Sequence, residues 1–107
     1  MGKQIKPSKA TVLCNNFDAK YNALTNFIEK KDNRSSLFTI QEIKDYIKYL
    51  ESSSEEVDGI RIYLGSYEDT NLSTVFLAPT LNGVDNIKLN ALNLSSNGIP
   101  PNKKYGK

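Results

Sequence analysis

The sequence contains no histidine, no tryptophan and a single cysteine among its 107 residues. Without histidine, the chain cannot build a Ser-His-Asp or Cys-His catalytic arrangement, nor a zinc site with histidine ligands. One cysteine excludes an internal disulfide framework. We therefore expect a protein that is not an enzyme and that holds neither a metal nor another cofactor.

Long apolar runs are missing as well. No stretch of the sequence approaches the ~20 apolar residues that a membrane helix needs. The first residues also lack the apolar segment of a secretory signal peptide. Together these features predict a cytoplasmic protein that makes no contact with a membrane. The net charge of +2 is too small to indicate a polyanionic partner by itself.

Two stretches have the apolar spacing of amphipathic helices. The first begins after Ser8, which is a good N-cap, and predicts a helix over about residues 9–31. The second begins at Thr39 and Glu42, which have the spacing of a capping box, and predicts a helix over about residues 40–53. The expected buried stripes are Ala10, Cys14, Phe17, Tyr21, Leu24 and Ile28 in the first helix, and Ile40, Ile43, Ile47 and Leu50 in the second, with Tyr46 at its margin.

Two strands and an irregular tail are expected next. Residues 59–65 alternate between apolar and polar between two glycines, which is typical of a half-buried strand. In this strand Ile60, Ile62 and Leu64 are expected to face the core. Residues 73–79 predict a second strand that Pro79 ends, and residues 81–107 are expected to be largely irregular. Two helices on a small antiparallel sheet give an α+β fold in a single domain.

Three segments between Phe38 and Thr80 carry a resemblance. They are the helix start at 39–43, the Gly-Ile-Arg-Ile-Tyr-Leu-Gly strand at 59–65 and the strand at 74–80. These segments resemble a group of small proteins from Bacteroidota bacteria to which we can assign no function. The resemblance implies a bacterial source and the α+β arrangement.

The charges are unevenly distributed along the chain. All 12 acidic residues lie between residues 18 and 85, whereas both ends are basic. One interpretation is ordinary solubility, and another is an acidic surface that docks onto a basic groove. A third is RNA binding by the basic ends, for which the candidate residues are Lys3, Lys6, Lys9, Lys103 and Lys104.

A candidate binding surface lies on the strand at 59–65 and on the connection that follows it. Arg61 and Tyr63 share one strand face, and both residue types are common in interface hot spots. Tyr67, Glu68 and Asp69 extend this surface into the projecting connection. In the alternative interpretation, the first helix or the tail covers the face, and Arg61 pairs with Asp58 or with an acid from a helix.

These observations favour a non-enzymatic binding module that acts on a larger protein or ribonucleoprotein. One form of this hypothesis, by analogy, is an inhibitor of a bacterial CRISPR ribonucleoprotein. A second hypothesis is a small-ligand or anion-binding domain that uses Arg61 with Tyr63 or Tyr67, and a third is an RNA-binding accessory protein. An unpaired strand edge on so small a sheet also makes a homodimer possible.

Overall fold

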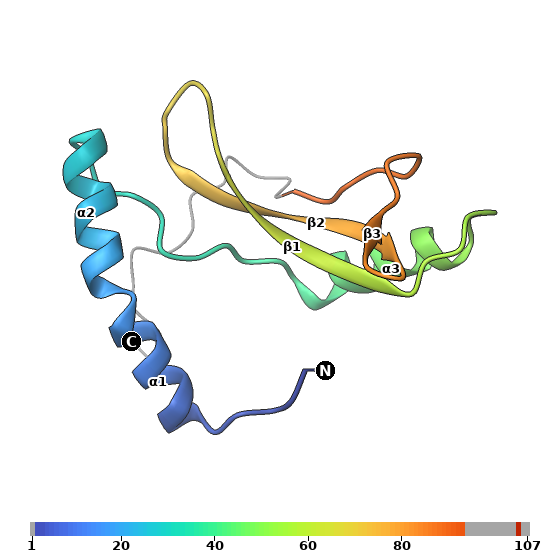
Figure 1. The fold of residues 1–107 in the computed structure, drawn as a ribbon, viewed down its shortest axis with the longest axis horizontal. Coiled ribbons are helices and arrows are strands. Elements are labelled where there is room, and N and C mark those ends of the chain that lie inside the picture. The colour runs from blue at the N-terminus through green and yellow to red at the C-terminus, as the bar shows by residue number, and fades with distance from the viewer. Residues whose placement is uncertain (1, 94–104, 106–107) are drawn as a thin grey trace.

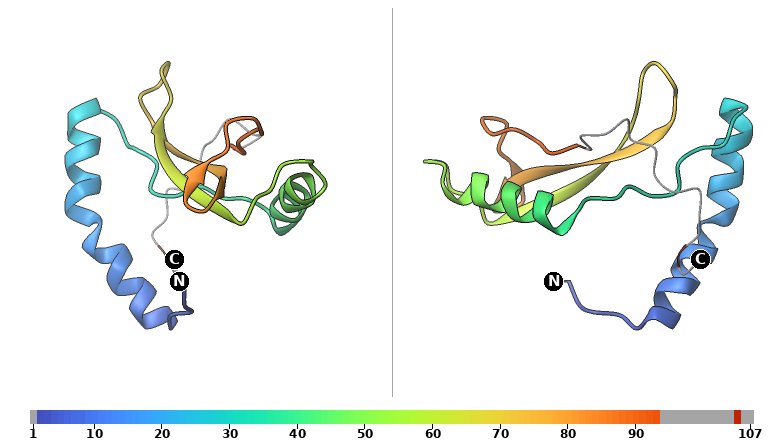
Figure 2. Two further views of the ribbon diagram at one scale, coloured as in Figure 1. Left: turned by 45° about the vertical axis from the view of Figure 1, so that its right-hand side comes forward. Right: turned by 180° about the vertical axis from the view of Figure 1, so that it is seen from behind.

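The computed structural model describes residues 2–93 and 105 of the chain. It confirms the α+β fold: a bent N-terminal helix, a second helix and a three-stranded antiparallel sheet (Figure 1). The bent helix lies beyond one end of the sheet, and the second helix lies near the other end (Figure 2). The elements are α1 (Pro7–Asn16), α2 (Asp18–Ile28), α3 (Ile40–Glu51), β1 (Gly59–Ser66), β2 (Ser73–Leu81) and β3 (Val84–Asp85).

The first helix differs from the expected single element over residues 9–31. It bends at Phe17, whose N–H donates to the Cys14 carbonyl at 3.1 Å, a tighter turn than that of an α-helix. Two asparagines precede this turn, and asparagine is a weak helix former. The helix ends at Ile28, because Glu29 adopts the left-handed conformation with φ of 59°. Of the expected buried stripe, Tyr21 alone is classed as buried.

Helix α3 has the capping box that the sequence predicts. The Glu42 N–H donates to the Thr39 hydroxyl at 3.0 Å, and the Thr39 N–H donates to the Glu42 carboxylate at 3.2 Å. The expected buried stripe is confirmed for Leu50 and, as a partly buried residue, for Ile43, but it is wrong for Ile40 and Ile47. Tyr46 is buried at the centre of the packed face, whereas Ile40 is 75% exposed and Ile47 is 38% exposed. The helix is therefore turned so that Tyr46, rather than Ile40, faces the sheet.

Strand β2 continues through Pro79, where the sequence predicted its end. Pro79 lies opposite Ile60 in the register. Its carbonyl accepts from the Asn86 N–H at 2.9 Å, on the side of β2 away from β1. Because the backbone groups of residue 79 point away from β1, the missing N–H of proline takes no bond from the β1–β2 ladder.

The expected irregular tail contains a third strand. Asn82 and Gly83 have φ of 52° and 79°, as a two-residue turn of a hairpin requires. This turn pairs Thr80 with Asp85. Further along, Leu92 and Leu77 exchange two backbone hydrogen bonds, both of 2.9 Å. The rest of the predicted tail, residues 94–104 and 106–107, lies outside the described residues.

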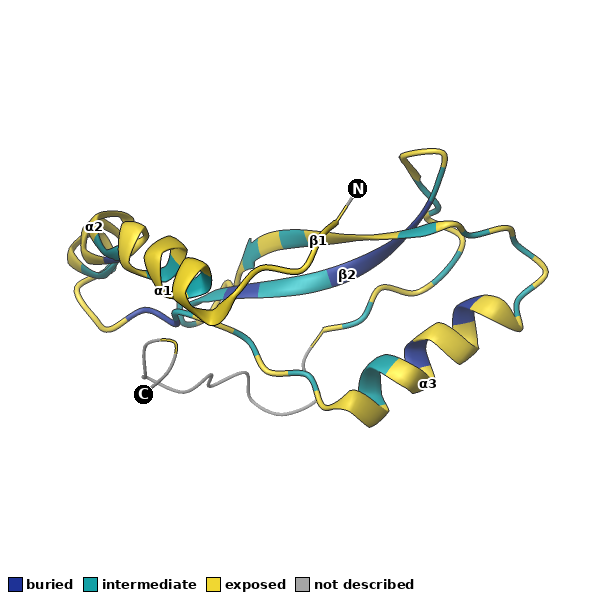
Figure 3. Ribbon diagram, turned by 90° about the horizontal axis from the view of Figure 1, so that it is seen from below, coloured by how far each residue is buried: buried dark blue, intermediate teal, exposed yellow. Residues whose placement is uncertain are grey.

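The hydrophobic core lies between α3 and β2. Its buried members are Tyr46, Leu50 and Leu77, and partly buried side chains pack around them. In Figure 3, β2 lies between β1 and α3, and Tyr46 and Leu50 of α3 pack with Leu77 of β2. The surrounding side chains are Phe38, Ile43, Val57, Leu89 and Leu92.

The apolar face of β1 is consequently not part of the core, which corrects the sequence prediction. The alternation of the strand is as expected, and Ile62 lies opposite the buried Leu77. However, Ile60 is 40% exposed, Ile62 65% and Leu64 87%. The chain therefore presents an apolar strand face to the solvent.

Tyr46 is a buried phenol in the core, and its ionisation is expected to oppose folding. Its hydroxyl donates to the Leu77 and Asn90 carbonyls at 3.3 and 2.8 Å, and burial raises the pKa of the phenol above its ordinary value of 10.0. The folded state therefore favours the neutral phenol. This stabilisation is complete below about pH 10 and is lost as the pH rises through the folded pKa.

We expect the free energy of unfolding to fall more steeply above about pH 10 for the wild type than for Tyr46→Phe. Denaturant titrations at a series of alkaline pH values measure both slopes. The other tyrosines are common to the two proteins and cancel in the comparison. Equal slopes would contradict the role of Tyr46.

Candidate protein-binding site

Arg61 and Tyr63 lie together on one face of β1, as the sequence predicts, and Asp85 of β3 holds both. The Arg61 guanidinium donates to an Asp85 carboxylate oxygen at 2.9 Å and to the Gly83 carbonyl at 2.7 Å. The Tyr63 hydroxyl donates to the other Asp85 oxygen. The hydrogen bond with Tyr63 and the charge of Asp85 raise the pKa of Arg61 above its ordinary value. The Arg61 side chain is 43% exposed, so this face is open to solvent.

The acid that neutralises Arg61 is therefore Asp85, and not Asp58 or an acid from a helix. Asp58 instead accepts from the Asn82 N–H at 3.1 and 3.2 Å. Glu55 accepts from the Asn86 side-chain amide at 3.1 Å. These two acids support the β2–β3 hairpin.

Tyr67, Glu68 and Asp69 lie in the connection between β1 and β2. The Tyr67 hydroxyl donates to the Asn93 side chain at 3.2 Å and accepts from the Thr74 hydroxyl at 3.1 Å. Glu68 and Asp69 are exposed. Arg61, Tyr63 and Tyr67 line neither the groove between α2 and the β1–β2 hairpin nor the hollow between the end of α3 and the start of β1. Because Asp85 also neutralises Arg61, the geometry gives an anion-binding site no support.

Of the basic residues proposed for RNA binding, those at the N-terminus are described. Lys3, Lys6 and Lys9 are all exposed, and Lys6 is the N-cap of α1. Lys103 and Lys104 lie outside the described residues.

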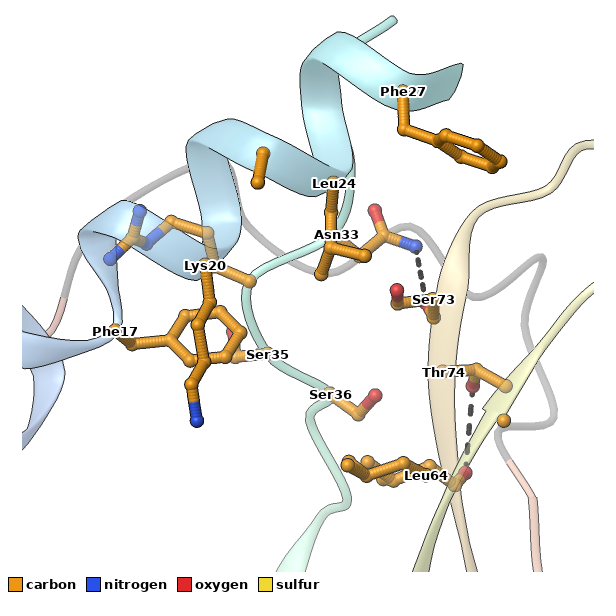
Figure 4. A pocket seen from close by; sticks show the side chains of 14 residues that line it. Phe17, Lys20, Leu24, Phe27, Asn33, Ser35, Ser36, Leu64, Ser73 and Thr74 are labelled. Atoms are coloured by element: carbon orange, nitrogen blue, oxygen red, sulfur yellow. Dashed lines mark hydrogen bonds between the residues drawn. The ribbon is translucent and has the colours of Figure 1, made fainter.

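A groove that the sequence analysis did not predict lies between α2 and the β1–β2 hairpin. Its volume is about 670 Å³. Phe27 extends from α2 toward the strands, and Leu64 lies across the opening from it (Figure 4). Both are almost fully exposed, at 86% and 87%. Phe17, Leu24 and Val75 supply further apolar lining.

Buried Asp32 joins the two walls of the groove. It is 2% exposed, and its carboxylate accepts from the Ser73 N–H and hydroxyl, both at 2.6 Å, and from the Asn33 N–H at 2.8 Å. The Tyr21 hydroxyl of α2 donates to the Asp32 carbonyl at 2.9 Å. The Asn33 side chain adds a bond to the Ser73 carbonyl at 3.0 Å. This network holds α2 beside the start of β2.

Arg34 packs against Tyr21 of this network and also lines the groove. Its guanidinium lies 4.4 Å from the centre of the Tyr21 ring and donates to Asp18 at 2.7 Å. The hydrogen bond with Asp18 raises the pKa of Arg34. Among the described residues that line the groove, Lys20 and Arg34 are the charged ones, and none carries a carboxylate.

The sequence did contain one sign of the groove. Phe27 is a large aromatic residue that falls outside the apolar stripe of its helix, which indicates a second apolar face. Asp32 and Asn33 gave no such sign, because charged and amide residues after a helix usually lie in solvent. Their burial depends on Ser73, some 40 residues further along the chain.

Comparison with protein-family models, with characterised proteins and with solved structures finds no match to this chain. The resemblance to Bacteroidota proteins thus stays a prediction. Within residues 2–93 and 105, no helix is long and apolar enough to span a membrane. The same part of the chain contains no cluster of side chains suited to hold a metal ion.

Proposed function

We propose that this chain is a non-enzymatic protein-binding module. In this proposal, the groove between α2 and the β1–β2 hairpin receives an apolar segment of a larger partner, with acidic residues beside it. The observation that carries the proposal is an open apolar groove whose charged lining residues are both basic. The partner is a free protein or the protein component of a ribonucleoprotein.

The form of the groove suits a polypeptide better than a small molecule. A volume of about 670 Å³ lies within the usual range for ligand pockets, but such pockets enclose most of their ligand. Here Phe27 and Leu64 at the opening are 86% and 87% exposed. An amphipathic helix or an extended segment laid into the groove would cover both side chains.

The charge of the lining specifies the polar side of the partner. Lys20 stands at the opening of the groove (Figure 4), where a partner carboxylate can approach it from solvent. Arg34 is already paired with Asp18, which leaves Lys20 as the cation available to a partner. An acidic flank on the partner would gain this interaction, whereas a basic flank would be repelled.

Phe27→Glu tests the proposal, because it places a negative charge in the apolar groove. Phe27 is 86% exposed, so the substitution removes little folded-state packing. We expect partner affinity to fall at least about tenfold. Ile87→Glu is the matched control, since Ile87 is 92% exposed and does not line the groove.

The wild type, Phe27→Glu and Ile87→Glu serve as baits in a pull-down from the native host at low salt, with and without nuclease. Calorimetry then measures the affinity of each for the purified partner. Support requires a nuclease-resistant partner that binds the wild type and Ile87→Glu but not Phe27→Glu. A partner that Phe27→Glu retains would contradict the groove. A partner lost with nuclease would favour RNA binding and direct substitutions to Lys3, Lys6 and Lys9.

A further inference from the structure

Strand β1 forms one edge of the sheet, since the strand order is β1-β2-β3. The other side of β2 is occupied in turn by Asp32, Leu92 and β3. No described segment pairs with the outer side of β1 in this way. An unpaired strand edge is a template for another strand.

The register identifies which backbone groups point out of this edge. Leu77 exchanges both of its backbone bonds with Leu92, so its N–H and C=O point away from β1. Ile62 lies opposite Leu77 and is therefore in a non-hydrogen-bonded pair. It follows that the N–H and C=O groups of Ile60, Ile62 and Leu64 point outward from the sheet. The residues with exposed apolar side chains are thus also those with outward backbone groups.

We propose that a second copy of this chain pairs with the β1 edge, antiparallel, about a two-fold axis at Ile62. This register places Ile62 opposite Ile62 of the partner subunit, and Ile60 opposite the partner subunit's Leu64. Each of these pairs joins outward backbone groups, as hydrogen-bonded pairs require. The interaction uses the strand edge and does not depend on the proposed function of the groove.

The other face of β1 is compatible with this register, and the pairs formed in the two neighbouring registers are less favourable. An axis at Ile62 places Arg61 opposite Tyr63 of the partner subunit, where a guanidinium can lie on an aromatic ring. An axis at Arg61 would place Leu64 opposite the partner's Asp58 and lose an apolar pair. An axis at Tyr63 would place Ile60 opposite the partner's Ser66 and lose an apolar pair. Asp85 already neutralises Arg61, so the edge carries no uncompensated charge.

Ile62→Lys tests the pairing, because it opposes two ammonium groups at the axis. The residue is 65% exposed in the single copy, so folding should be retained. A contact between two strand edges buries little surface and belongs to the class of weak interfaces. Sedimentation equilibrium should therefore span concentrations from about 1 µM to 1 mM. We expect a wild-type dimer whose dissociation constant rises at least about a hundredfold in Ile62→Lys. Ile87→Lys has the same charge change away from the edge and should remain dimeric.

Charge reversal provides a second variant that a folding defect could not imitate. Ile62→Glu alone should be monomeric, and a mixture of Ile62→Glu with Ile62→Lys should form a heterodimer through the opposed charges. Amide hydrogen exchange at Ile62 should slow as the concentration of the wild type rises. A monomer throughout the concentration range, or a dimer that Ile62→Lys leaves intact, would overturn the proposal. Amide protection at Ile62 that persists in the monomer would overturn it too.

Discussion

Replacing Asp32 with alanine is expected to lower the free energy of unfolding by about 3 kcal/mol. The carboxylate is 2% exposed and accepts three hydrogen bonds from Ser73 and Asn33. Alanine would leave these donors buried without an acceptor, and removing one member of a buried polar network costs more than the bond itself contributes. The substitution should also release α2 from the sheet.

Denaturant titration measures the stability loss, and limited proteolysis between α2 and α3 measures the release of the helix. Asp32→Asn retains one acceptor oxygen and should give an intermediate loss. Asp69→Ala removes an exposed carboxylate from the β1–β2 connection and should leave both measurements close to the wild type. If Asp32→Ala behaves like Asp69→Ala, Asp32 does not join the walls of the groove.

Leu50→Ala is expected to lower the free energy of unfolding by about 3 kcal/mol, whereas Leu64→Ala should change it by less than about 0.5 kcal/mol. Leu50 is 4% exposed in a core with few buried members, and Leu64 is 87% exposed. The same three carbon atoms are removed in both variants, so the difference in unfolding free energy reports burial alone. Similar losses for the two variants would mean that the apolar face of β1 is covered.

Local signals in the sequence predicted the elements well. The capping box of Thr39 and Glu42 marked the start of α3, and the alternation between two glycines marked β1. The sequence also contains a signal for the turn at Asn82 and Gly83, since Asn-Gly strongly favours a hairpin. The sequence analysis assigns these residues to an irregular tail, so it misses β3 and the position of Asp85 beside Arg61.

The assignment of apolar faces to the core could not be made from periodicity. The pattern shows that Ile62 and Leu64 share a face with each other, but not whether a helix covers that face. The covering depends on where α3 docks, and Tyr46 directs it to β2 through bonds to Leu77 and Asn90. The prediction that all apolar stripes share one core was therefore wrong for β1, and the groove follows from that difference.

The candidate site was predictable only in part. Arg61 and Tyr63 do share a face, and the structure adds the acid that holds them. Their role in partner binding stays a prediction. The groove depends on Asp32 and Ser73, which meet only through the tertiary fold, so its one local sign in the sequence is Phe27.

The central claim is that an apolar groove between α2 and β1 is open to another polypeptide. Methyl relaxation by a soluble paramagnetic chelate tests it most directly in the 107-residue chain at low concentration. We expect the methyl groups of Leu64 to relax nearly as fast as those of Ile87, and those of Leu50 and Leu77 to be protected. The exposed fractions, 87% and 92% against 4% and 6%, predict this order. Protection of Leu64 equal to that of Leu50 would contradict the open groove and the binding function proposed for it.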